Sequence, residues 1–242
     1  MIFRTGGPCD DGAGRARNRV GSLSTLVRLA REGKREEFEA LVTRGLLPAW
    51  AFRANELVIV RLTRPRPLPR ALPHVAIRPA GPADEPLFQA IRPRKGGYGV
   101  NFERGSLAFL GEVSGEPAAF GWFELGERHR SKTNGYSFAL GPGAAWAWGI
   151  EVEPRFRLSG IFHKYWVESL PLLAARGVSE VLGSIQADNP LSINSHRRLG
   201  FELLYTLRVV RAAGVTWHRA DSADGSHLPA SRGFGPWHGA AH

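Results

Sequence analysis

The sequence predicts an α/β fold with a mixed, mostly antiparallel sheet flanked by helices and a small N-terminal α/β appendage. Short apolar runs rich in β-branched residues alternate with helical patterns. Several neighbouring runs are joined by short turns, which is typical of antiparallel hairpins. A strand-helix-strand unit interrupts them and indicates a parallel pair in the same sheet. A chain of 242 residues with 43% hydrophobic residues can bury a full core.

Composition divides the chain into four segments. Residues 1–20 form a glycine- and arginine-rich leader that we expect to be disordered. Residues 21–73 hold two short helical patterns, a strand at 56–62 and a proline-rich connector that can continue neither helix nor central strand. Residues 74–220 form the main domain. Residues 221–242, rich in Gly, Ser, Ala and His, are expected to be a disordered tail.

The sequence of the main domain predicts an alternation of strands and helices. The first strand begins at Val75, and the acidic residues Asp84 and Glu85 favour a helix start soon after it. The order that we expect is β-α-β-β-β-α-β-α-β-β. Its segments after the first helix are strands at 106–113, 118–125 and 144–152, a helix at 160–175, a strand at 178–186, a helix at 190–198, and strands at 201–211 and 215–219.

The charge of the chain is concentrated at its N-terminal side. The formal net charge is +10, and residues 1–80 hold 15 Lys and Arg against 7 Asp and Glu, leaving 17 against 15 for the rest. There is no zinc-finger spacing or helix-turn-helix pattern, so we do not expect nucleic acid as a partner. The single cysteine, Cys9, forms no internal disulfide or cysteine-based zinc cage, and we expect no metal. We expect a cytoplasmic protein without a membrane span.

The junction between the strand at 144–152 and the helix after it has the composition of a phosphate site. Pro154 ends the strand, and a polar turn follows up to Gly160. Free backbone amides at a helix start attract an anion, and glycine lets the anion approach the main chain. Arg155 and Arg157 could add charge-assisted contacts. An ordinary helix start has a similar composition.

A second motif follows about thirty residues later, Asn189-Pro-Leu-Ser-Ile-Asn-Ser-His-Arg-Arg-Leu-Gly-Phe201. Together the two motifs resemble the GNAT superfamily of acetyl-CoA-dependent N-acyltransferases over about residues 75–220. The first resembles the pyrophosphate loop R/Q-x-x-G-x-G/A, and the second resembles N-x-x-A/S-x-x-x-Y/H-x-x-x-G-F. The resemblance implies acetyl-CoA as acyl donor and these donor-binding residues: Val152, Arg157, Leu158, Ser159, Gly160, Ile161, Phe162, Asn189 and Ser192.

The resemblance also implies a mechanism and candidate catalytic residues. The strand near Val152 is expected to splay at a bulge, hold the pantetheine arm and polarise the thioester carbonyl. Glu151 and Glu124 are candidates to take a proton from the acceptor amine, against the alternative of solvated or paired carboxylates. His196 is either an acid for the departing thiolate or a packing residue. Asn189 either contacts the coenzyme or caps its helix.

Some features depart from the family pattern. Phe162 replaces a small residue and crowds the phosphate unless its ring turns into the core, and Pro171 is expected to kink its helix. The acceptor is expected to be a primary amine of a small molecule or peptide, and Arg94, Lys95 and Tyr98 are either acceptor contacts or a solvated loop. A homodimer is compatible with the sequence. The alternative to an enzyme is a catalytically degenerate GNAT-like module that binds CoA or docks a partner.

Overall fold

The computed structural model describes residue 32 and residues 52–131, 136–212, 215–222, 231–233 and 237–240. The chain forms two compact units, of which one comprises residues 55–210 and 215–242 and the other residues 1–54 and 211–214. The leader, Cys9 and the two N-terminal helical patterns lie outside the described residues. The larger unit carries the sheet and the candidate site.

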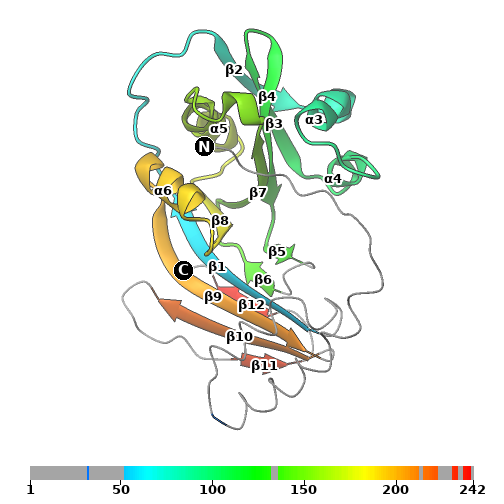
Figure 1. The fold of residues 1–242 in the computed structure, drawn as a ribbon, viewed down its shortest axis with the longest axis vertical. Helices are drawn as coiled ribbons and strands as arrows, with labels where there is room; N and C mark the ends of the chain where they lie inside the picture. Colours follow the sequence, from blue (N-terminus) through cyan, green and yellow to red (C-terminus); the bar gives the residue numbers. More distant parts are fainter. Residues whose placement is uncertain are drawn as a thin grey trace. The chain divides into compact units, whose positions relative to one another are not determined.

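The central element is a nine-stranded sheet with the order β11-β10-β9-β1-β8-β7-β4-β3-β2 (Figure 1). Antiparallel pairs dominate it, and β7 pairs with β8 in parallel. The predicted fold class is therefore confirmed. The strands are β1 (Phe52–Leu62), β2 (Val75–Ala80), β3 (Leu107–Val113), β4 (Glu116–Leu125), β7 (Ala144–Val152), β8 (Glu180–Gln186), β9 (Glu202–Ala212), β10 (Val215–Ser222) and β11 (Ser231–Gly233).

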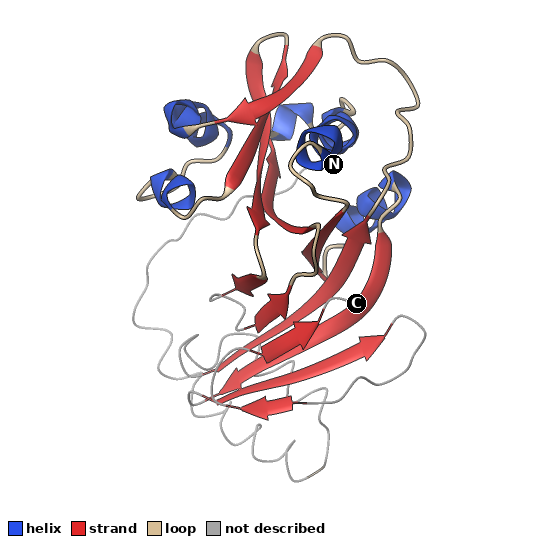
Figure 2. Ribbon diagram, turned by 180° about the vertical axis from the view of Figure 1, so that it is seen from behind, coloured by secondary structure: helices blue, strands red, loops and turns tan. Residues whose placement is uncertain are grey.

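Helices pack on both faces of this sheet (Figure 2). Helix α5 (Ile161–Ala174) buries Tyr165 and Trp166 in a core that also contains Val60 and Phe123. Helix α3 (Glu85–Ile91) inserts Phe88 into a separate aromatic cluster. The other helical segments are η2 (Pro82–Asp84), α4 (Gly99–Glu103), η3 (Pro154–Phe156) and α6 (Pro190–Leu199). No helix in the described part of the chain is long and apolar enough to cross a membrane.

Every element expected between residues 75 and 219 is present, together with some that the sequence pattern did not predict. Strands β5 (Arg128–Ser131) and β6 (Tyr136–Ala139) form a second sheet with β12 (Trp237–Ala240). Each has four residues, too few for a periodic pattern to stand out. Strands β11 and β12 lie in the segment that was expected to be a disordered tail.

Strand β1 lies inside the main sheet, between β8 and β9. It pairs antiparallel with β8 from Leu57 opposite Gln186 to Leu62 opposite Val181. Val58 and Val60 belong to the core beneath α5, and Ile59 belongs to the core on the opposite face. Burial on both faces explains why this strand is a continuous apolar run. The compact unit that contains the sheet thus starts at Asn55, before the proline-rich connector.

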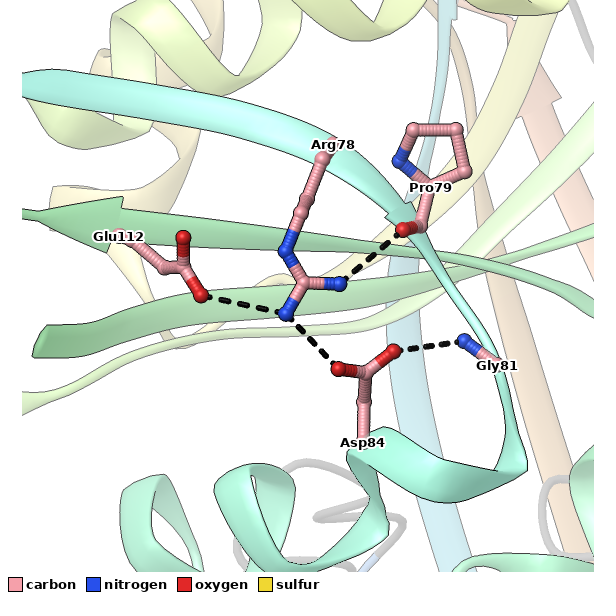
Figure 3. Close-up of polar contacts among 5 residues, drawn as sticks. All are labelled: Arg78, Pro79, Gly81, Asp84 and Glu112. Atoms are coloured by element: carbon pink, nitrogen blue, oxygen red, sulfur yellow. Dashed lines mark hydrogen bonds and ion pairs between the residues drawn. The ribbon is translucent and has the colours of Figure 1, made fainter. Parts of the chain in front are cut away.

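A charged network ties the start of α3 to the sheet (Figure 3). The Arg78 guanidinium on β2 donates to Asp84 Oδ1 at 2.7 Å and to Glu112 Oε1 on β3 at 3.2 Å. The Gly81 amide donates to Asp84 Oδ2 at 2.9 Å. The hydrogen bond from Arg78 lowers the pKa of Asp84, which keeps this carboxylate ionised. The network fixes where the chain leaves β2 and enters the helix.

Candidate active site

Strand β7 contains a bulge at the position where the resemblance leads us to expect one. Phe120 pairs with Glu151 and Trp122 pairs with Trp148, so two residues of β7 oppose Gly121 alone. Gly149 adopts the left-handed conformation with φ 58°, which glycine favours. The bulge bends β7 away from a regular ladder at its midpoint.

Just before the bulge, β7 separates from β8. The parallel pairing runs from Ala144 opposite Glu180 to Ala147 opposite Gly183 and stops there. On its other side, β8 pairs with β1 from Val181 to Gln186. Among the described strands, none pairs with residues 148–152 on the side of β8. Backbone amides and carbonyls on that side are available to a ligand, apart from the Val152 carbonyl, which accepts from Arg157 Nε at 3.5 Å.

The start of α5 offers a second set of free backbone donors. Gly160 is the N-cap in the left-handed conformation with φ 88°, and an added Cβ there would lie 3.0 Å from Leu72 Cδ1. Ile161 N donates to Ser159 Oγ at 3.3 Å, whereas the amides of Gly160, Phe162 and His163 have no hydrogen-bond partner among the described residues. Leu158 is 99% exposed, so the loop faces solvent. Such an amide cluster at a helix start is suited to an anion.

The two arginines of this loop differ in their partners. Arg155 forms ion pairs with Glu116 at 2.8 Å and Glu153 at 3.1 Å, so its charge is largely compensated. Arg157 is exposed, and no carboxylate pairs with it among the described residues. Lys164, in the first turns of α5, donates to the Leu72 carbonyl at 2.7 Å. Arg157 is therefore the loop cation that remains available for an anionic ligand.

Phe162 does not crowd the loop. Its ring packs against the core beneath α5, with its centroid 5.1 Å from that of His196 and 6.5 Å from that of Trp166. The ring has thus turned inward, which leaves the amide of Phe162 accessible. Pro171 falls in the last turn of α5, where the helix ends at Ala174.

His196 on α6 joins the two helices of this face. Its Nδ1 lies 2.7 Å from the Ser192 carbonyl oxygen, an acceptor, so Nδ1 carries the proton of the neutral ring. Burial lowers the pKa of His196 and favours that neutral form. Its ring contacts Phe162 and Phe201 edge to face. In this state Nε2 accepts and cannot donate, which favours the packing alternative over the acid.

Asn189 is the N-cap of α6. Its Oδ1 accepts a hydrogen bond from Ser192 N at 3.1 Å, which satisfies one of the free amides at the helix start. The Ser192 hydroxyl lies 3.4 Å from His196 Nδ1. Of the two roles considered for Asn189, capping is the one that its geometry displays.

The two candidate carboxylates have different partners. Glu151 on β7 forms an ion pair with Arg92. Glu124 on β4 lies 2.6 Å from Nδ1 of His129, and the His129 ring stacks on Trp146 with centroids 4.3 Å apart. His129 could not be identified as a site residue from the sequence, because it lies in β5, a strand of four residues in a segment without periodicity. The one clue in the sequence was Glu124, an acidic residue in a neighbouring strand that could pair with a histidine.

Two cavities flank the bulge. One, of about 450 Å³, is lined by Glu124 and His129 together with residues of β7 and β8 where these strands separate. The other, of about 480 Å³, is lined by Glu151, Arg92 and Tyr98. Trp148, Gly149 and Arg94 line both. No cluster of side chains suited to a metal ion is found among the described residues.

Comparisons with known proteins give partial likenesses of fold. A protein from Novosphingobium aromaticivorans assigned to the GNAT acetyltransferase family is 19% identical, with a TM-score of 0.48, over 65% of this chain and 63% of that one. The ribosomal-protein-S18-alanine N-acetyltransferase from Escherichia coli is 19% identical, with a TM-score of 0.42, over 63% and 88%. An aminoglycoside N-acetyltransferase in complex with CoA is 17% identical, with a TM-score of 0.40, over 52% and 91%.

No family model and no curated protein sequence matches the chain. The chain spans less than two-thirds of the first of these solved proteins. The first of these three solved proteins is assigned to the GNAT family, and the other two are N-acetyltransferases.

Proposed function

We propose that this chain is an N-acyltransferase of the GNAT superfamily, which moves an acetyl group from acetyl-CoA to a primary amine of a small molecule or peptide. The observation that carries the proposal is the continuity between two sets of free backbone groups. Strand β7, open on the side of β8 past Ala147, leads directly into the loop whose amides are free at the start of α5. A donor with an extended amide arm and a diphosphate matches this pair of features.

The donor is expected to bind along this path. The amides of Gly160, Phe162 and His163 would hold the diphosphate, with Arg157 adding charge. The pantetheine arm would pair with the open side of residues 148–152, as a peptide adds to a free strand edge. One amide in this stretch would polarise the thioester carbonyl. Asn189 and Ser192 would shape the neighbouring end of the site at the start of α6.

The acceptor amine attacks the thioester carbon, the C–N bond forms, the C–S bond breaks and CoA leaves as thiolate. An ammonium ion has no lone pair for this attack, so a base must first take its proton. Glu151 and Glu124 are the carboxylates beside the bulge, and each already has a partner in Arg92 or His129. His196 is the acid candidate of the sequence motif, and its Nδ1 already donates to the Ser192 carbonyl.

The experiment that tests the proposal measures donor binding and turnover separately. Calorimetry with CoA reports binding, and thiol release from acetyl-CoA with a panel of primary amines reports transfer. Gly160→Glu places bulk and negative charge in the amide cluster and is expected to abolish CoA binding. Gly141→Glu is the matched control, because an added Cβ at Gly141 meets no atom within 4 Å and this residue lies outside the loop.

Equal CoA affinity of the two glutamate variants would remove the loop from the proposal. CoA binding to the unmodified chain without thiol release for any amine would instead favour the degenerate module. We prefer an active enzyme to a degenerate module because the cavity beside the bulge is lined by a hydrogen-bonded histidine and carboxylate, His129 and Glu124.

A further inference from the structure

Three arginine side chains line the cavity that borders the separation of β7 from β8. Arg94 follows α3, Arg104 follows α4 and Arg130 lies on β5. The same cavity, of about 450 Å³, is lined by Gly149 of the bulge and Ser184 of β8. Segments far apart in the sequence thus bring three cations to the place where the acyl group would emerge.

These arginines have no carboxylate within ion-pair distance in the part of the chain that the structure describes. Other arginines of the same unit do have such partners, as Arg78 has Asp84 and Arg92 has Glu151. Arg94 lies over the Tyr98 ring at 5.5 Å, a contact that leaves its guanidinium donors free. The carboxylate that lines the cavity, Glu124, is held by His129. The three arginines outnumber this one carboxylate, so the cavity presents an excess of positive charge.

The His129–Glu124 pair gives the same cavity a proton acceptor. With Nδ1 donating to Glu124, the neutral ring keeps the lone pair on Nε2. The His129 ring is fixed between Trp146, at 4.3 Å, and Tyr136, at 5.8 Å. Enzymes commonly activate a nucleophile with a base that a third group, such as a carboxylate, holds in position.

From this convergence we propose that the cavity binds the acceptor, and that the acceptor is a small primary amine carrying a carboxylate or phosphate group. Arg94, Arg104 and Arg130 bind the anionic group, and Nε2 of His129 takes the amine proton. The inference rests on the proposed acyl transfer. It adds the chemical class of the acceptor and a base that the sequence motifs do not contain.

The proposed step balances as follows. The ammonium form of the acceptor gives one proton to solvent as it binds. The neutral amine nitrogen attacks the thioester carbon, and its second proton passes to Nε2 of His129 as the C–N bond forms. The C–S bond then breaks, and the thiolate takes up that proton to leave as the thiol. The products are an N-acyl amine and CoA, and Glu124 stabilises the imidazolium between the two transfers.

The experiment compares matched amines that differ in the anionic group. L-alanine is paired with L-alaninamide, O-phosphoethanolamine with ethanolamine, and spermidine serves as a polycation. Thiol release is expected to give kcat/KM at least about tenfold higher for the anionic member of a pair, because a charge-assisted hydrogen bond is lost in the other. The two pairs separate a carboxylate site from a phosphate site.

Variants assign the effect to the cavity. Arg104→Gln and Arg130→Gln are each expected to raise KM for the anionic acceptor roughly tenfold or more with little change in kcat. Arg176→Gln is the control, an exposed arginine near the end of α5 outside this cavity that loses the same charge. His129→Gln is expected to lower kcat on the order of 10²-fold and to remove the limb of the kcat–pH profile that reports the base.

Equal kcat/KM within both pairs, or efficient turnover of spermidine, would overturn the inference and leave the proposed transfer standing. Absence of thiol release with every amine would count against the proposed transfer instead. Calorimetric titration of the same pairs into CoA-saturated protein then tests the acceptor class without requiring turnover. Tighter binding of the anionic members, lost in Arg130→Gln, supports it, and equal binding within each pair overturns it.

Discussion

Nδ1 of His129 lies 2.6 Å from Oε2 of Glu124, and the imidazole is parallel to the Trp146 ring within 8°. The His129 side chain is only 7% exposed, whereas that of Glu124 is 32% exposed. The pair joins β5 to the central sheet at β4 and forms part of the cavity wall. A hydrogen bond that links two strands also fixes which nitrogen of the ring is protonated, so structure and reactivity depend on one contact.

Replacing Glu124 by glutamine keeps a hydrogen-bond acceptor for Nδ1 but removes the negative charge that stabilises the imidazolium. We expect kcat to fall on the order of 10²-fold with CoA affinity unchanged. Steady-state kinetics across pH, with calorimetry for CoA, measure both. Glu127→Gln, an exposed carboxylate in the loop before β5, is the matched control. A kcat equal to that of the control would make the pair a structural contact alone.

The bulge in β7 gives a second prediction. Gly149→Val places a β-branched residue at φ 58°, where an added Cβ also lies 3.3 Å from Trp122 Cδ1. A valine in the left-handed conformation costs roughly 1–3 kcal/mol. The strand can relieve this strain by losing the bulge, which would narrow the opening beside β8. We expect kcat/KM for acetyl-CoA to fall at least about tenfold. Gly149→Asn, which tolerates this conformation, should retain most of the activity. Equal losses in both variants would show that the backbone conformation is not what matters.

His196→Phe separates packing from acid catalysis. Because Nδ1 donates to the Ser192 carbonyl and the neutral ring dominates, we expect kcat within about threefold of the parent. An acid in the transition state contributes about 10² or more, so a fall of that size would return His196 to the mechanism. Thiol release with saturating acetyl-CoA measures the difference.

The same variant makes a prediction about stability. Burial lowers the pKa of His196 below its ordinary value of 6.5, so the unfolded chain binds a proton that the folded chain resists. The stability that follows from the neutral ring is present above pH 6.5 and is lost as the pH falls toward the folded pKa. Urea unfolding between pH 7.5 and 5.5 should show a steeper loss for the parent than for His196→Phe. Parallel curves would contradict the burial of this ring.

The helix starts at Gly160 and Asn189 could be predicted from sequence because their signals are local. A glycine after a polar turn and an asparagine before proline specify caps within a few residues. The His129–Glu124 pair could not be predicted, because it depends on a strand of four residues folding back beside β4. Pairings of this kind are set by tertiary packing and leave no periodic pattern.

Strand β1 was predicted as a strand, but its place in the sheet could not be predicted. Its apolar run predicts a strand, but no local pattern specifies that it enters the sheet between β8 and β9. The proline-rich connector suggests a boundary at residue 73, yet its backbone bonds back to the helices, with Arg66 N donating to the Leu199 carbonyl at 2.8 Å. Local composition marks a proline-rich segment, but it carries no information about how the residues before that segment pair with the sheet.

The position of β1 leads to the last prediction. If residues before the connector were an independent appendage, core substitutions in β1 would leave the main domain unaffected. Ile59 is fully buried and packs with Trp146 and Leu182 in the core beside the arginine-lined cavity. Ile59→Ala is therefore expected to destabilise the whole unit by about 2–5 kcal/mol in urea unfolding, with one cooperative transition.

The control for Ile59→Ala is Glu56→Ala in the same strand, an exposed position expected to change stability by less than about 0.5 kcal/mol. Intrinsic fluorescence from the seven tryptophans, among them Trp146 in the sheet, should follow the same transition as the circular dichroism signal. A separate, earlier transition confined to part of the signal would mean that β1 can leave while the rest stays folded. Because Leu57 of this strand lines the arginine-containing cavity, such a departure would also remove part of the cavity wall.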